Sequence, residues 1–215
     1  MKQVFSCKWL FAILLLLAGT QPAGAQTLKE FFNSSEVPLT YLGVDFTQAK
    51  VLNDIAANAM DIRDRQFAAI NQVIVNEPKK YDFQQTFSKT TVTNDISFVN
   101  AKNAKVDAEK IIASGEVKED RFTNATIESI VKGYSFSGKK GIGLMFIMET
   151  MNKASATASM YVTFIDLASG KVLLTDRVTA KAAGFGFRNY WAKTVDAVLK
   201  DIAKSKYKEW KAKAG

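Results

Sequence analysis

The chain of 215 residues contains no histidine and only one cysteine. The lack of histidine removes the most common general base and the most common zinc ligand. A single cysteine can form neither an internal disulfide nor a cysteine cluster around a metal. We therefore expect no catalytic residue set, no cofactor and no bound metal, which narrows the function classes open to the chain.

The remaining composition is that of an ordinary globular protein. Hydrophobic residues make up 47% of the chain and charged residues 23%. These values exclude the disordered, collagen-like and disulfide-rich classes. Lysine and arginine number 29 and aspartate and glutamate 21, so the formal charge is +8.

Residues 1–25 have the pattern of a secretory signal peptide. Lys2 and Lys8 supply positive charge, and the apolar stretch 9–18 follows them. This stretch is shorter than the roughly 20 apolar residues that span a bilayer. The small residues 23–25 fit a cleavage site. The sequence therefore predicts export, most simply to the periplasm, with an uncleaved membrane anchor as the alternative.

Cleavage at this site would leave a chain that begins at Gln26. Two lysines leave with the segment, so the formal charge falls to +6. The only cysteine, Cys7, lies before the apolar stretch, so we expect no lipid attached just after the cleavage site. We expect a helical appendage over 26–38, in which Thr27 and Glu30 form a capping box, and a single domain over 39–215.

The apolar patterns predict an α/β (α+β) sandwich with a mixed sheet, a carboxyl-terminal three-stranded antiparallel meander and flanking helices. The predicted strands cover 39–46, 96–99, 142–151, 157–167 and 172–182. The predicted helices cover 51–75, 106–112, 127–131 and 189–210. In the first long helix, Leu52, Ile55, Ala59 and Ile62 are expected on the apolar face.

Residues 184–191 combine two glycines with four aromatic side chains and an arginine. The candidate partner-binding residues are Phe185, Phe187, Arg188, Tyr190 and Trp191. Exposed aromatic and arginine side chains are typical of binding hot spots. The alternative is a strand-to-helix turn whose aromatics pack into the core, with Asn189 capping the helix.

The last residues carry most of the remaining positive charge. The candidate residues for contact with an anionic surface are Lys204, Lys206, Lys208, Lys211 and Lys213. Such a basic helix can be attracted weakly to an anionic membrane face. The alternative is a solvated helix end whose lysines complement the helix dipole.

One pattern resembles a known group of envelope proteins. The segment 161–173 reads as a strand, Asp166, a short turn with Ser169-Gly170, and a return strand, while Val44-Asp45-Phe46 ends the first strand. With an amphipathic helix at the end, about residues 39–210 resemble the α/β domain shared by the TolB amino-terminal region, CsgG and LpoB. The resemblance implies non-enzymatic envelope proteins that bind other proteins. The chain departs from the lipoproteins by lacking their lipid-bearing cysteine, and it also resembles uncharacterised exported proteins of the Bacteroidetes type.

We therefore expect a non-enzymatic periplasmic protein whose partner is another envelope protein, and we expect no nucleic-acid partner. One alternative is a carrier or sensor of a small apolar ligand, because methionine is abundant at positions 145, 148, 151 and 160. Another is a secreted enzyme that uses lysine or carboxylates, such as Glu149 with Asp166. The oligomeric state is left open.

Overall fold

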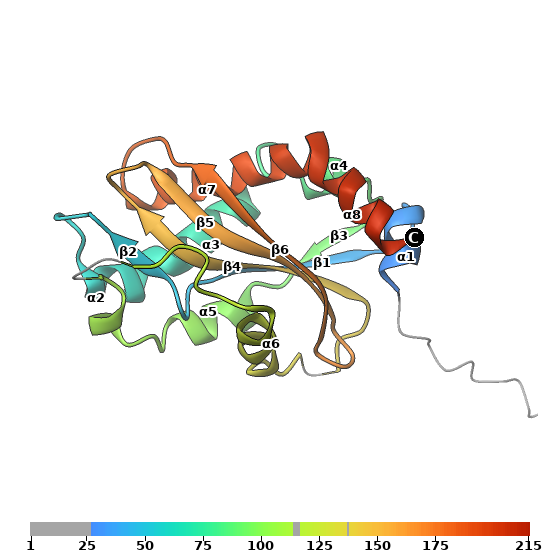
Figure 1. Cartoon of the computed structure of the whole chain (residues 1–215), viewed down its shortest axis with the longest axis horizontal. Helices are drawn as coiled ribbons and strands as arrows, with labels where there is room; N and C mark the ends of the chain where they lie inside the picture. Colours follow the sequence, from blue (N-terminus) through green and yellow to red (C-terminus); the bar gives the residue numbers. More distant parts are fainter. Residues whose placement is uncertain (1–26, 114–116, 137) are drawn as a thin grey trace, which may run out of the picture.

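The computed structural model describes residues 27–113, 117–136 and 138–215. The predicted signal peptide, including Cys7, lies outside these residues. Within them the chain forms one sheet with helices on both faces (Figure 1). No helix of this described part is long and apolar enough to cross a bilayer.

The sheet has six strands and mixed pairing. Its strand order is β3-β1-β4-β5-β6, and β2 also pairs with β4. The first three strands are parallel to their neighbours, whereas β4, β5 and β6 form an antiparallel meander. This confirms the predicted mixed sheet and its carboxyl-terminal meander. The strands are β1 (Leu39–Asp45), β2 (Lys50–Leu52), β3 (Val92–Asn94), β4 (Ile142–Asn152), β5 (Thr157–Asp166) and β6 (Lys171–Lys181).

Helices cover the two faces of the sheet and enclose two apolar cores. The larger core lies under α1, α3, α4, α7 and α8, and the smaller one lies under α5 and α6 (Figure 1). The helices are α1 (Leu28–Asn33), α2 (Ala59–Asp61), α3 (Phe67–Asn76), α4 (Phe83–Phe87), α5 (Ser97–Asn103), α6 (Asn124–Lys132), α7 (Phe187–Asp201) and α8 (Tyr207–Ala214). Two π-helical turns, Ile62–Gln66 and Ile202–Lys206, join α2 to α3 and α7 to α8, and a 3-10 turn covers Ala108–Lys110.

The three meander strands agree with prediction to within one residue at each end. In β4 and β5 almost every side chain is buried, because both faces of these strands are covered. A strand covered on both faces reads as a continuous apolar run rather than as an alternation. The apolar run over 142–151 is long enough to be recognised as a buried strand from the sequence alone.

Three predictions in the first half of the chain are wrong. The helix expected over 51–75 begins only at Ala59, because 50–52 form β2. Residues 97–99 of the strand expected over 96–99 belong to α5, and Ile96 directly precedes this helix. The Asp95 carboxylate accepts hydrogen bonds from the backbone and hydroxyl of Ser97, the first residue of the helix. The helix expected over 106–112 is reduced to a 3-10 turn, because the backbone of residues 111–113 pairs with Val51.

The first helix belongs to the larger core. Thr27 and Glu30 form the expected capping box. The following phenylalanines are buried, and the ring of Phe32 lies 5.7 Å from Phe164 of β5 and 5.4 Å from Tyr207 of α8. The residues of the predicted appendage therefore share apolar packing with residues 39–215.

Two buried asparagines hold the end of β1. The pairing of β3 with β1 covers only residues 39–41. Beyond it, Asn71 of α3 accepts a hydrogen bond from the Val44 amide at 2.7 Å and donates to the Val44 carbonyl at 3.1 Å. Asn103 of α5 accepts from the Phe46 amide at 2.8 Å and also donates to the Val44 carbonyl at 3.0 Å. These carboxamides take the place of a neighbouring strand.

The approach of the asparagines depends on Gly43. The backbone φ of Gly43 is +104°, a positive value that favours glycine because it has no side chain. The pairing register of β1 with β4 shifts between Tyr41 and Gly43. A Cβ at this position would lie 2.6 Å from Val99 and 3.0 Å from the Asn71 carboxamide oxygen. The sequence Leu42-Gly43-Val44 therefore places a bulge where α3 and α5 reach the strand.

We predict that Asn71→Ala lowers the free energy of unfolding by about 2–4 kcal/mol, because it leaves the Val44 amide buried without its partner. Asn76→Ala, at the exposed end of the same helix, is the control and should change it by less than about 0.5 kcal/mol. Urea denaturation measures both. Equal, small effects of the two substitutions would show that the Asn71 contacts contribute little.

Lys89 binds the carbonyl groups at the carboxyl-terminal end of α1. Its buried ammonium donates hydrogen bonds to the carbonyl of Phe31 and, at 2.7 Å, to that of Ser34. It also lies 3.8 Å from the centroid of the Phe31 ring. Burial, with a smaller contribution from Lys211, lowers the pKa of Lys89 to about 8. The charged form is therefore disfavoured in the folded chain.

This shift predicts a pH dependence of stability. Between about pH 8 and pH 10.5 the unfolded chain retains a proton on Lys89 that the folded chain has lost, so stability should rise with pH through this window. Relative to Lys89→Met, the wild-type free energy of unfolding should increase by about 1–3 kcal/mol across it. Lys79→Met, an exposed control, should follow the wild type. A constant difference between wild type and Lys89→Met would contradict the shift.

Candidate partner-binding surface

The aromatic segment 184–191 forms the connection from β6 to α7. Gly184 and Gly186 have backbone φ values of +115° and +72°, which residues with an L side chain rarely adopt. They permit the turn that brings the chain from the sheet to the helix. Gly186 is the residue that precedes α7, so the expected cap at Asn189 is wrong: that residue already lies in the first turn of the helix.

The structure separates the predicted aromatic residues into two groups. Trp191 is 1% exposed and belongs to the larger core, and Phe187 and Tyr190 pack partly against it. Phe185 is 94% exposed and Arg188 is also on the surface. The start of α7 therefore anchors the turn, and the turn presents Phe185 and Arg188 to solvent. Partner binding by these residues stays a prediction.

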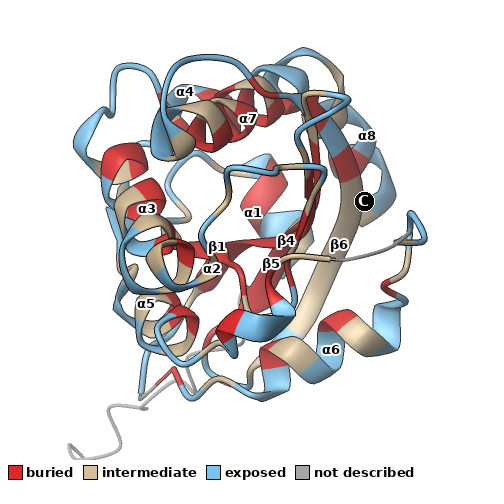
Figure 2. Cartoon of the chain, turned by 90° about the vertical axis from the view of Figure 1, so that its left-hand side faces the viewer, coloured by how far each residue is buried: buried red, intermediate tan, exposed pale blue. Residues whose placement is uncertain are grey.

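Further apolar side chains lie beside this turn. Ile55 is 105% exposed and Met60 is 53% exposed. The segments that carry them border a cavity of about 300 Å³, which is lined by Asp54, Ala56, Ala57, Asn58, Asp61, Ile62, Lys153, Gly186, Phe187 and Trp191. We call the exposed residues Ile55, Met60, Phe185 and Arg188, together with the half-buried Phe187, the apolar end. It lies at the end of the molecule that faces the viewer in Figure 2, around α2 and the start of α7.

A second hollow extends the apolar end along α3. It measures about 370 Å³ and is lined by residues 185–189 together with Arg65, Gln66 and Ala69. Arg65 is paired with Asp61 at 2.7 Å, and the side chain of Arg188 donates to Asn189 at 3.0 Å. Hydrogen bonds from Arg65 and Gln66 lower the pKa of the Asp61 carboxyl. Charged groups thus border an apolar centre, as at protein interfaces.

Sequence reasoning placed Ile55 on the buried face of a helix, and this is wrong. Ile55 lies in the turn between β2 and α2, where Asn53 has a positive φ of +55° and Asp54 bonds to the Ala56 amide. A single isoleucine between turn-forming residues was the available indication of exposure. Met60 gave no such indication, because its position on α2 matches helical spacing.

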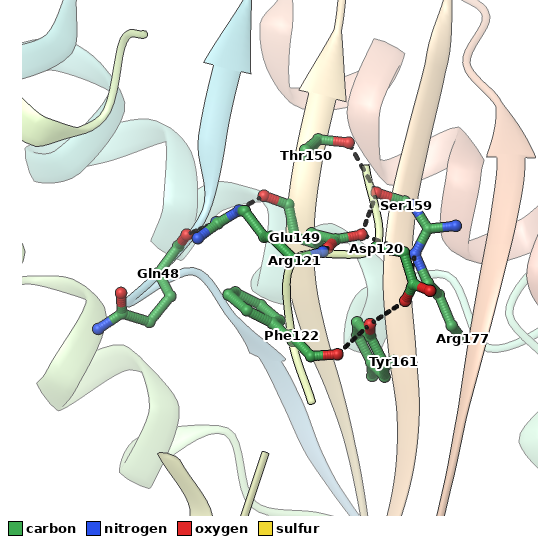
Figure 3. Close-up of polar contacts among 9 residues, drawn as sticks. All are labelled: Gln48, Asp120, Arg121, Phe122, Glu149, Thr150, Ser159, Tyr161 and Arg177. Carbon is green, nitrogen blue, oxygen red and sulfur yellow. Dashed lines mark hydrogen bonds and ion pairs between the residues drawn. The ribbon is translucent and has the colours of Figure 1, made fainter. Parts of the chain in front are cut away.

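A buried polar cluster fixes residues 120–122, in the loop that precedes α6, on the face of the sheet that α5 and α6 cover (Figure 3). The Glu149 carboxylate is fully buried at the β-bulge in β4. It accepts hydrogen bonds from Arg177 Nε at 2.8 Å, from the Ser159 hydroxyl at 2.9 Å and from the Arg121 amide at 2.7 Å. The bulge turns this side chain toward the loop that precedes α6.

The loop residues complete the cluster. The Arg121 guanidinium donates to the Glu149 carbonyl at 3.1 Å and to the Gln48 carbonyl. The Tyr161 hydroxyl is 2.8 Å from the Phe122 carbonyl and 2.9 Å from the Asp120 carboxylate (Figure 3). Burial and Asp120 raise the pKa of Tyr161. The hydrogen bonds of Glu149 thus tie β4, β5 and β6 to the loop that precedes α6.

The structure does not bring Glu149 and Asp166 together. In the β4–β5 register, Asp166 lies opposite Ile142, which precedes Glu149 by seven residues in β4. At about 3.4 Å per residue, Asp166 and Glu149 are about 24 Å apart along the strands. Asp166 instead accepts from the Ser169 hydroxyl at 2.5 Å and from the Ala168 amide at 3.2 Å. The predicted turn role of Asp166 is thus confirmed.

The basic carboxyl-terminal residues lie on α8 and the turn before it. Trp210 anchors this helix, because it is buried and donates to Asp176 of β6 at 2.9 Å. Lys206 is paired with the same carboxylate at 3.0 Å. The other four predicted lysines, Lys204, Lys208, Lys211 and Lys213, are exposed. Contact of these lysines with an anionic surface stays a prediction.

No protein-family profile matches the sequence, and no curated protein matches it. Among solved structures, the fold is similar to the carboxyl-terminal domain of LpoB from Salmonella enterica, with 8% identity and a TM-score of 0.30, over 72% of this chain and 96% of that one. It is also similar to an uncharacterised protein, with 11% identity and a TM-score of 0.20, over 84% and 92%. Similarity of this degree establishes neither a shared family nor a shared function.

We predict that Glu149→Gln lowers the free energy of unfolding by about 3 kcal/mol, because it removes the buried partner of Arg177 and leaves only the exposed Asp120 carboxylate, at 3.7 Å, to compensate its charge. Glu128→Gln, an exposed change of the same kind on α6, should have an effect below about 0.5 kcal/mol. Thermal and urea unfolding of both variants measure the difference. A Glu149→Gln variant as stable as wild type would show that the cluster does not hold the loop.

Proposed function

We propose that this protein is exported and acts without catalysis, by binding another envelope protein through the apolar end. The export part of the proposal rests on the signal-peptide pattern of residues 1–25. The binding part rests on one observation: Ile55, Met60 and Phe185 are exposed, and the segments that carry them lie together. Exposed apolar patches with a polar border are a mark of protein-binding sites.

The apolar end is well suited to binding because it stands on a rigid base. Phe187 and Tyr190 pack on Trp191, whose ring is in the core. Phe187 and Arg188 are therefore held in the first turn of α7, directly after Phe185, which reduces the ordering cost of association. Phe185 and Arg188 are residue types that contribute strongly when an interface buries them.

The alternative of an apolar-ligand carrier receives no support from the structure. Its evidence was the methionine content, and Met145, Met148, Met151 and Met160 are all buried within the two cores. They fill space between the sheet and the helices, as methionine commonly does. We therefore propose no second function.

Photo-crosslinking tests the proposed surface. The full chain, carrying p-benzoylphenylalanine in place of Phe185, is expressed in the envelope, and covalent adducts are identified. Ser169, in the exposed β5–β6 turn away from the apolar end, is the control position. We expect a protein adduct from position 185 that position 169 does not form. The same adducts from both positions would contradict a specific surface.

Substitution then tests the contribution of the apolar side chains to affinity for the captured protein. The variant Ile55→Ser with Phe185→Ser should bind it at least tenfold more weakly, because both apolar contacts are lost. Phe185→Tyr keeps the ring and should bind within about twofold of wild type. The free energy of unfolding should stay within about 0.5 kcal/mol, since these side chains are exposed. Unchanged binding by the double variant would contradict the proposal, as would substrate turnover abolished by a single substitution.

A further inference from the structure

A separate hollow of the molecule is lined by lysines. The cavity has a volume of about 400 Å³ and lies between residues 47–50, which join β1 to β2, and residues 102–110, at the end of α5 and the 3-10 turn. This volume lies in the range of small-molecule sites. It is separate from the apolar end, because no residue lines both.

The charge of this cavity is strongly one-sided. Lys50, Lys102, Lys105 and Lys110 line it, and Asp107 is the acidic residue among the lining residues. Asp107 is already paired with Lys110 at 3.2 Å, and the nearby Arg63 also acts on it. Four lysines and a single carboxylate therefore line the cavity. We call this site the lysine cavity.

The neighbouring groups increase this excess. The Arg121 guanidinium donates to the carbonyl of Gln48, a residue that lines the lysine cavity. Burial, Arg121 and Lys110 together lower the pKa of Lys50, and Asp107 offsets them only in part. The Lys50 ammonium donates to the Lys110 carbonyl, which fixes it at the wall. Positive groups are thus held close together although they repel one another.

Lys102 is also fixed in place. Its ammonium lies 4.3 Å from the centroid of the Tyr134 ring. The Tyr134 hydroxyl donates to the buried Asp45 carboxylate at 2.6 Å, and that carboxylate also accepts from the Thr47 amide and hydroxyl at 2.6 Å. Asp45 is thereby committed to its own hydrogen bonds. It fixes the Thr47 end of the lysine cavity.

We infer that the lysine cavity binds a small anion with two or more negative charges, of the phosphate-ester class. Such an anion would relieve the repulsion among the four lysines and accept their hydrogen bonds. Lysine binds phosphate as a point charge from several directions, which fits ammonium groups on separate segments. This site and the proposed protein-binding surface are independent, because they use different residues.

Calorimetric titration of the purified chain with pyrophosphate at low salt tests this inference. We expect saturable binding that Lys105→Gln with Lys110→Gln weakens at least tenfold, because the pair removes two charges and releases Asp107 toward the anion. The matched control, Lys208→Gln with Lys211→Gln, removes the same charge from α8 and should bind within about twofold of wild type. Phe185→Ser should leave the titration unchanged. Thermal unfolding verifies that each variant is folded.

The amide chemical shifts of residues 47–50 and 102–110 should change on titration, which would locate the anion. A chain that does not bind pyrophosphate at millimolar concentration would overturn the inference, as would equal losses in the two double variants. A parallel arm uses phosphatidylglycerol vesicles. Vesicle binding that requires Lys105 and Lys110, without pyrophosphate binding, would also overturn it, because the site would then recognise a lipid surface.

Discussion

The hydrogen bonds from Asn71 and Asn103 to the end of β1 are the constraint on which the rest of the molecule depends. A central strand without a neighbour on one side would leave buried amides and carbonyls unpaired, at a cost of about 1–3 kcal/mol each. Here the side-chain carboxamides pair with Val44 and Phe46 instead. The replacement works only because Gly43 lets α3 and α5 come close to the strand.

Both proposed binding regions follow directly from this strand. Residues 47–50 leave the end of β1 and form one wall of the lysine cavity. The chain then passes through β2 and reaches Ile55 and Met60 of the apolar end. The buried cluster around Glu149 acts on the same segment from the other side, because Arg121 bonds to the Gln48 carbonyl. Two polar networks thus hold one stretch of backbone from which both surfaces are built.

The parts of the fold that could be predicted are those with a local signal. The apolar runs of β4 and β5 and the capping box at Thr27 depend on neighbouring residues, and both are present. The strand predicted over 96–99 was wrong, since three apolar side chains in this segment outweighed the weak local signal of α5, which begins at Ser97 without a side-chain cap. The lysine cavity had no local signal, because Lys50 and residues 102–110 are far apart in the sequence. The apolar end could be predicted from the sequence only in part. Its aromatic turn was a candidate binding segment, but Ile55 is brought close to that turn only by the tertiary fold.

Hydrogen exchange of individual amides, followed by NMR on the purified chain, tests the central constraint most directly. The account predicts that the amides of Val44 and Phe46 exchange as slowly as those of the central strand β4, which open only with global unfolding. Exchange of Val44 and Phe46 at the rate of the exposed turn around Ile55 would contradict it. That result would mean that the asparagines do not hold the end of β1, and that neither surface has the fixed base described above.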